Sequence, residues 1–246
     1  ATPPLLTVTV DALYYKPCSL RLSSGAGKIV RKSGNYINLH PQIKRPEVCI
    51  MNSNWLTGKT VVITGGSGGL GLALAQRLIH RWGCHVIATG RSPERLEAAR
   101  AAIGETPDGS YTCRAFDVTD RAAWADFSAD LAKRGVSVDV LINNAGFMLP
   151  FTRLEKLCDG DIDRILETNL RAYLTAFRAL YPLMPTGRGK SRPAVIHIVS
   201  AGGLCPVVGQ GMYCATKYAL RGVTDALRAE HPDLYVCCLL YTSDAA

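Results

Sequence analysis

Two residues of the segment GQGMYCATKYALRG have side chains suited to proton transfer. Tyr213 and Lys217 stand four positions apart, and residues at that spacing on a helix lie on one face. A phenol with its usual pKa of about 10 is a poor base at neutral pH, but a neighbouring ammonium group stabilises the phenolate and lowers that pKa. The two residues are therefore either an acid–base pair or polar residues on a solvated face, and the spacing does not decide between these interpretations.

A glycine-rich segment, TGGSGGLG (Thr64–Gly71), has the composition of a phosphate-binding loop. It follows the β-branched run KTVVIT and opens a segment with helical spacing of apolar residues. Glycine lets the backbone approach a pyrophosphate, and a helix N-terminus offers free N–H groups to it. The glycine spacing differs from G-x-G-x-x-G and from G-x-x-x-x-G-K-[ST], which disfavours a kinase or NTPase. The candidate dinucleotide-binding residues of this loop are Gly65, Ser67, Gly69, Leu70 and Gly71.

Strand-like and helix-like segments alternate through the body of the chain. Short β-branched runs predict strands at 59–64, 85–90, 111–118, 138–146, 193–200 and 234–240. Apolar residues at helical spacing predict helices at 71–83, 92–103, 120–135, 159–184 and 212–230. This alternation predicts an α/β fold of the doubly wound, Rossmann type, in which helices cover both faces of a parallel sheet. The ligand crevice of such a fold lies at the carboxyl ends of the strands.

Four motifs occur in order along this pattern: TG-x-x-x-G-x-G from Thr64, NNAG from Asn143, Ser200 after the fifth strand, and Y-x-x-x-K from Tyr213. Over about residues 55–237 the chain resembles the short-chain dehydrogenase/reductase family. The resemblance implies an oxidoreductase that interconverts a carbonyl and an alcohol by hydride transfer, with the tyrosine as acid and base. It also implies that six of the seven strands of the family's sheet are present.

The resemblance assigns catalytic roles to Asn169, Ser200, Tyr213 and Lys217. The Ser200 hydroxyl would hydrogen-bond the same substrate oxygen as Tyr213, although a serine in a turn is the alternative. Lys217 would lower the phenol pKa and hold the nicotinamide ribose. Asn169 would anchor a water in the proton relay to Lys217, with an exposed helix asparagine as the alternative.

The expected cofactor is NADP(H), with NAD(H) left open. The residue after the second strand of this fold meets the adenosine ribose, where an acid favours NAD and an arginine can bind a 2′-phosphate. The sequence has no acid there and places Arg91 at that point, in ATGRSPERLE. The resemblance adds further cofactor contacts at Asp117, Val118, Asn143, Ala145, Gly146, Tyr213 and Lys217.

Composition indicates a cytoplasmic protein with small-molecule partners. The net charge is +8, but residues 1–50 contribute five of these charges, so a basic nucleic-acid-binding face is not indicated. The nine cysteines show neither CxxC nor zinc-like spacing, which favours reduced thiols and no metal site. No apolar run is long enough to predict a membrane span.

The two ends of the sequence differ from its middle. Residues 1–50 lack periodicity and contain five prolines, so we expect a disordered or non-native extension outside the working domain at 51–237, with a transit peptide as the alternative. The last nine residues, 238–246, resemble a translated sequencing adapter and predict a non-native tail. The alternative is an ordinary strand, LYVCCLLY. The first of these interpretations predicts a truncated enzyme that lacks the lid over its substrate.

The substrate is predicted only by class. The segments MLPFTRLEKL (148–157) and GLCPVVGQGM (203–212) are expected to line the pocket, and their apolar character favours an uncharged or lipid-like carbonyl or alcohol. The helices at 159–184 and 212–230 are expected to form a homodimer or homotetramer face, while a monomer stays open. Two other functions stay open: a nucleotide-binding sensor of the same fold, and a fragment inactive through truncation.

Overall fold

The computed structural model describes residues 28–30, 36–38, 55–185 and 192–241, which fall in two units divided after Asn52. In the first unit, strand β1 (Lys28–Val30) pairs antiparallel with β2 (Tyr36–Asn38), and Ile29 lies opposite Ile37. This short hairpin falls in the segment for which we expected disorder. The rest of the predicted extension lies outside the described residues.

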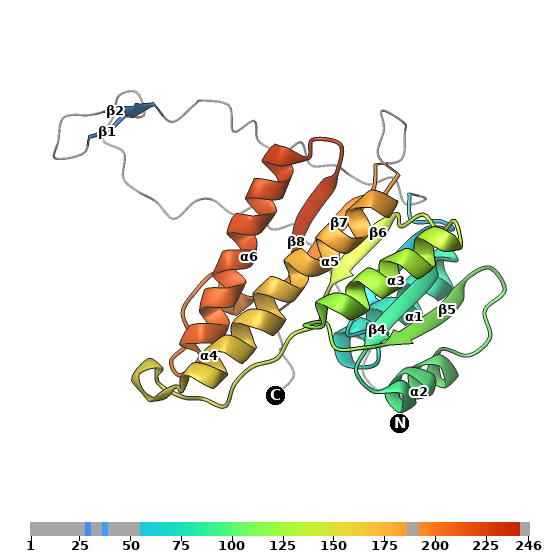
Figure 1. Cartoon of the computed structure of the whole chain (residues 1–246), viewed down its shortest axis with the longest axis horizontal. Coiled ribbons are helices and arrows are strands. Elements are labelled where there is room, and N and C mark those ends of the chain that lie inside the picture. Colours follow the sequence, from blue (N-terminus) through green and yellow to red (C-terminus); the bar gives the residue numbers. More distant parts are fainter. Residues whose placement is uncertain (1–27, 31–35, 39–54, 186–191, 242–246) are drawn as a thin grey trace. The chain divides into compact units, whose positions relative to one another are not determined.

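The second unit is a six-stranded parallel sheet with the strand order β5-β4-β3-β6-β7-β8 (Figure 1). The predicted doubly wound α/β fold is therefore confirmed. The strand order reverses between β3 and β6, and ligands of such sheets bind at the carboxyl ends on either side of that reversal. The strands are β3 (Thr60–Thr64), β4 (His85–Gly90), β5 (Ser110–Ala115), β6 (Val140–Asn143), β7 (Ala194–Ser200) and β8 (Tyr235–Tyr241).

Helices cover both faces of this sheet because the central strands are apolar on both sides. Along β6, for example, Val140 and Ile142 pack on one face and Leu141 packs on the other. The first face is covered by α1 (Gly69–Trp82) and α2 (Pro93–Ile103). The second face is covered by α3 (Arg121–Lys133), α5 (Ala172–Leu180) and α6 (Gly211–Glu230) (Figure 1).

The helix predicted as one element at 159–184 is interrupted. It consists of α4 (Asp159–Leu166), a π-helical turn η2 (Glu167–Arg171), α5 and the 3₁₀ turn η3 (Tyr181–Leu183). Single π turns inside helices occur often at functional positions, and η2 contains Asn169. Two further 3₁₀ turns, η1 (Leu154–Lys156) and η4 (Ala201–Gly203), were not predicted.

Strand β8 extends past the predicted end of the working domain. Its register with β7 runs from Tyr235 to Tyr241, so Cys238 to Tyr241 continue a paired strand. Parallel pairing is made by the backbone and needs only an extended chain, so the non-native origin of 238–246 stays a prediction. Residues 242–246 lie outside the described residues.

A hydrogen-bond clamp joins the ends of β3 and β6 at the point where the strand order reverses. The buried Thr64 hydroxyl accepts hydrogen bonds from the backbone N–H groups of Asn144 (2.9 Å) and Ala145 (3.0 Å). In return, the Asn144 side-chain amide donates to the carbonyl oxygens of Thr64 (2.9 Å) and Gly65 (3.2 Å). The clamp therefore sets the position of the glycine loop relative to the NNAG segment.

We expect Thr64→Val to lower the free energy of unfolding by about 1–3 kcal/mol, because it keeps the shape of the side chain and removes the acceptor of two N–H groups. Urea denaturation measures this change. The matched control is Thr112→Val, whose hydroxyl makes one long bond (3.5 Å) to the Val86 carbonyl and whose loss should stay within about 0.5 kcal/mol. Equal effects of the two variants would contradict the clamp.

Candidate active site

The glycine loop connects β3 to α1 in a conformation that only glycine can adopt at several positions. Gly65 and Gly69 have positive φ angles of 68° and 52°. A Cβ atom at Gly71 would lie 2.2 Å from the Gly65 carbonyl oxygen and 2.7 Å from the Asn144 amide nitrogen. The loop therefore brings the first turn of α1 against the carboxyl end of β3.

The first turn of α1 has the properties of an anion site. Its N-cap is Gly68, no side chain caps the N–H groups there, and the turn contains no acid. Free N–H groups and the positive end of the helix dipole favour a phosphate at this place. Leu70 packs its side chain against the core, so only its backbone faces this turn. The loop thus fits the diphosphate of a dinucleotide.

Two arginines flank this turn. Arg91 follows β4 as predicted and is exposed. Arg95, which our reading of the sequence missed, reaches back from α2 so that its Nη2 atom lies 2.8 Å from the position of a Cβ on Gly68. Within the described residues neither guanidinium has a hydrogen-bond or ion-pair partner. The signal was present in the sequence, since Arg91 precedes the N-cap Ser92 and Arg95 falls in the first turn of the helix predicted there.

The two predicted cofactor contacts after β5, Asp117 and Val118, interact mainly with their own turn and with the core. The Asp117 carboxylate accepts hydrogen bonds from the N–H (2.9 Å) and hydroxyl (2.7 Å) of Thr119, which closes a local turn. Val118 is 7% exposed and packs in the core, while its carbonyl accepts from the Trp124 indole. Any contact of Val118 with a cofactor would therefore be made by its backbone.

The Asn143 side chain is directed into the core, so any contact of Asn143 with a cofactor would be made by its backbone. It is fully buried under α5, and its amide donates to the Tyr173 carbonyl (3.3 Å). Its neighbour Asn144 instead makes the clamp to the glycine loop. The side chains of a strand alternate between its faces, so the two asparagines of NNAG could not both face the same way. Ala145 and Gly146 follow at the open end of β6, where Gly146 is exposed.

Asn169 fixes the segment after β6 beside Lys217. It is fully buried, its Oδ1 accepts from the Phe147 N–H (3.0 Å), and its Nδ2 donates to the Phe147 carbonyl (2.8 Å). The alternative of an exposed helix asparagine is therefore wrong. A Cβ at Gly146 would lie 3.1 Å from Asn169 Oδ1 and 3.8 Å from Lys217 Nζ, so this glycine allows the close approach of all three elements.

The serine, tyrosine and lysine come together between β7 and the first turns of α6. The Ser200 hydroxyl accepts from the Gly202 N–H (3.2 Å), and the Tyr213 ring packs on Gly202, with Cε1 3.3 Å from the position of a Cβ there. Lys217 Nζ lies 5.6 Å from the centre of the Tyr213 ring and donates to the Ile198 carbonyl (2.9 Å). Tyr213 and Lys217 are therefore packed side chains, and the alternative of two residues on a solvated face is wrong for Lys217, which is 4% exposed.

The electrostatics of this cluster differ from the prediction in one respect. Burial raises the pKa of the Tyr213 phenol, and the hydrogen bond with Ser200 offsets part of that rise. We expected Lys217 to lower it, but its ammonium group is directed to the Ile198 carbonyl. Burial lowers the pKa of Lys217 itself to about 8. The amine can therefore exchange a proton near neutral pH.

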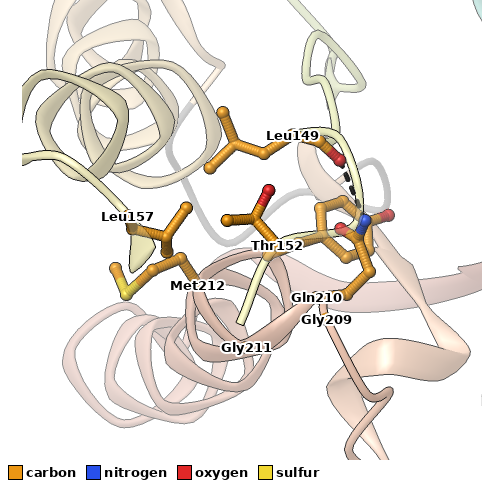
Figure 2. A pocket seen from close by; sticks show the side chains of 8 residues that line it. Leu149, Thr152, Leu157, Gly209, Gln210, Gly211 and Met212 are labelled. Atoms are coloured by element: carbon orange, nitrogen blue, oxygen red, sulfur yellow. Dashed lines mark hydrogen bonds between the residues drawn. The ribbon is translucent and has the colours of Figure 1, made fainter. Parts of the chain in front are cut away.

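A small cavity opens beside Tyr213 (Figure 2). It measures about 170 Å³ including its open mouth. Both segments predicted to line a substrate pocket contribute to it, with Leu149, Thr152 and Leu157 from one and Gly209, Gln210, Gly211 and Met212 from the other. The cavity therefore joins the predicted acid–base residue to walls that are about equally polar and apolar.

The parallel sheet, the uncapped first turn of α1 and the Ser–Tyr–Lys cluster are together typical of dinucleotide-dependent oxidoreductases. Residues 59–238 match the short chain dehydrogenase family, and the chain belongs to it. The 3-oxoacyl-[acyl-carrier-protein] reductase FabG of Rickettsia conorii is 33% identical over 176 residues, which cover 71% of this chain and 67% of the relative. The NADP-dependent 3-hydroxy acid dehydrogenase YdfG of Salmonella typhi is 34% identical over 69% of this chain and 65% of the relative.

A solved structure supports the same assignment. A metagenomic short-chain oxidoreductase in complex with NADP superposes with a TM-score of 0.66 at 30% identity, covering 78% of this chain and 85% of its own. The family catalyses carbonyl–alcohol oxidoreduction, so the predicted class of enzyme is confirmed. In the described part of the chain, no helix has the length and apolar content needed to cross a bilayer.

The buried amine of Lys217 predicts a specific dependence of stability on pH. Between pH 8 and 10.5 the unfolded lysine keeps its proton while the folded one has released it, so stability rises with pH in this window. We expect the difference in unfolding free energy between wild type and Lys217→Met to grow by about 2 kcal/mol from about pH 7.5 to about pH 10. Urea denaturation at both pH values measures it, and comparison with the variant cancels other titrations. A difference independent of pH would contradict the lowered pKa.

Proposed function

We propose that this chain is an NADP(H)-dependent oxidoreductase in which Tyr213 is the acid and base. The observation that carries the proposal is the cluster of Ser200, Tyr213 and the buried Lys217, together with the uncapped first turn of α1. A nucleotide-binding sensor of the same fold has no need for this set. The cytoplasmic location and the homo-oligomeric assembly stay predictions.

Different residues of the crevice would contact different parts of the cofactor. The backbone of Gly65, Ser67, Gly69 and Gly71 would hold the diphosphate, and Ala145 and Gly146 would face the adenosine side. Asp117 would contact the adenine, and Lys217 the nicotinamide ribose. When bound, the nicotinamide supplies or accepts the hydride.

The protein's own part in the reaction is proton transfer and orientation. In reduction, the Ser200 and Tyr213 hydroxyls hydrogen-bond the carbonyl oxygen of the substrate and stabilise the charge that develops there. The phenol proton of Tyr213 then moves to that oxygen and yields the alcohol. Lys217, whose pKa of about 8 is near neutrality, can then return a proton to the phenolate. Oxidation of an alcohol follows the same steps in reverse.

The preference for NADP(H) rests on Arg91 and Arg95. Arg91 follows the carboxyl end of β4 and Arg95 reaches over Gly68, and within the described residues neither guanidinium has a partner; the adenosine ribose of this fold would bind beside them. Guanidinium groups bind phosphate through paired N–H donors. The NADP-dependent YdfG and the NADP complex of the metagenomic enzyme support the same preference.

Tyr213→Phe should lower kcat by about 10²–10⁴-fold, because it removes the transferred proton and keeps the ring. Binding of NADPH, measured by fluorescence titration, should stay within about twofold of wild type, since the phenol is not the main cofactor contact. Tyr218→Phe is the matched control, because Tyr218 lies five residues further along α6, its side chain is exposed and its hydroxyl donates to the Leu204 carbonyl. Turnover retained by Tyr213→Phe removes the tyrosine from this role.

The double variant Arg91→Ala/Arg95→Ala should weaken NADPH binding by about 10²- to 10⁴-fold, since it removes two guanidinium–phosphate bonds that are each worth about 1.5–3 kcal/mol. NADH binding should change little, because NADH lacks the 2′-phosphate. Isothermal titration with each cofactor measures both effects. Arg100→Ala, on the same helix and ion-paired with Glu97, is the control. Equal losses for NADPH and NADH would show that the arginines do not select the 2′-phosphate.

A further inference from the structure

The side chain of Gln210 has one amide atom that the fold leaves without a partner. Gln210 is the N-cap residue of α6 and is 4% exposed. Its Nε2 atom donates to the Leu149 carbonyl (2.8 Å), as the dashed line in Figure 2 shows. Its Oε1 atom is buried and has no hydrogen-bond partner among the described residues.

The Leu149 carbonyl determines which way this amide faces. The opposite orientation would set the Gln210 oxygen against the Leu149 oxygen, two acceptors with no proton between them. A second bond, from the Thr152 N–H to the Gly209 carbonyl (2.9 Å), holds the same two segments together. The Oε1 atom is therefore an acceptor with a fixed orientation, held by two hydrogen bonds between the segments 149–152 and 209–210.

This acceptor lies at the cavity that also contains Tyr213. Gln210 and Tyr213 both line it, three residues apart on the first turn of α6. The walls also include the polar Thr152 and the apolar Leu149, Leu157 and Met212 (Figure 2). A buried acceptor without a donor destabilises the folded protein, and a ligand that supplies the donor removes that penalty.

We propose that Gln210 Oε1 accepts a hydrogen bond from the substrate and so selects small carbonyl or alcohol compounds that carry an N–H or O–H group beside a short apolar body. The inference rests on the proposed function, because it takes Tyr213 as the site of the reacting oxygen. It narrows the substrate class that the apolar segments predicted.

The size of the cavity limits the enclosed part of the substrate. The space of about 170 Å³ includes open solvent, and its enclosed part has room for about one water molecule, so only the donor group of a substrate would be enclosed. A longer apolar chain would extend beyond the cavity onto its surroundings, where Phe151 is 74% and Val208 is 87% exposed. The atoms nearest the reacting carbon therefore decide the selectivity.

N-methylacetoacetamide and methyl acetoacetate test this inference, because they are small 3-oxo compounds that differ only in an N–H group replaced by oxygen. With NADPH and the full chain, kcat/KM should be about 10-fold or more higher for the amide, since a site built around a hydrogen bond rejects the analogue that lacks it. In Gln210→Met the ratio of the two kcat/KM values should fall to about 1, because methionine has a similar size and no amide oxygen.

The matched control is Gln76→Met. Gln76 lies on α1, and its Nε2 atom also donates to a backbone carbonyl, that of Ala102 (3.3 Å), far from the cavity in the sequence and on another helix. This variant should keep the wild-type ratio and the wild-type activity. A ratio that falls equally in Gln76→Met would overturn the inference, since the effect would then not belong to the cavity.

Dissociation constants of both compounds, measured by NMR titration in the presence of NADP⁺, give a second readout that needs no turnover. The amide should bind about 10-fold more tightly to wild type and no more tightly than the ester to Gln210→Met. Equal kcat/KM values and equal dissociation constants of the two compounds for wild type would overturn the role of Gln210 and leave the proposed function standing. If the protein binds neither NADPH nor either of the two compounds, that result contradicts the proposed function, and the inference falls with it.

Discussion

The burial of one ammonium group constrains the whole site. Lys217 carries its charge into a position that is 4% exposed, where an unpaired cation is strongly disfavoured. The Ile198 carbonyl accepts one of its hydrogen bonds, and the rings of Tyr173 and Tyr213 lie 5.5 and 5.6 Å from Nζ. Burial lowers its pKa to about 8, so the same burial that disfavours the charged amine also allows it to exchange a proton near neutral pH.

The parallel sheet makes this placement possible. Strands β3, β6 and β7 end at one edge, so the glycine loop, the NNAG segment and Ser200 meet there although they are far apart in the sequence. Thr64 and Asn144 join the first two of these segments through four hydrogen bonds, and Asn169 joins the segment after β6 to η2 through two more. Buried polar side chains therefore fix the glycine loop and the segment after β6.

Much of the fold and of the site could be predicted from local signals. The start of α2 follows its capping serine and proline, and α3 begins after Asp120, which caps the Ala123 N–H as such residues do. The direction of Asn143 and the pairing of Asn169 with Phe147 could not be predicted, because they depend on contacts with distant segments. The interruption at η2 was missed for a similar reason, since a π turn shows no signature in apolar spacing.

The sequence by itself determined the alternation of strands and helices, the glycine loop and the identity of the serine, tyrosine and lysine, because period and residue type are local properties of the chain. Tertiary structure alone decided that the Lys217 ammonium group faces Ile198, that Arg95 reaches the glycine loop and that Gln210 keeps a buried oxygen without a donor. Hydrogen-bond partners and desolvation come from residues that the fold brings together, so they set the chemistry of side chains whose presence the sequence had already specified.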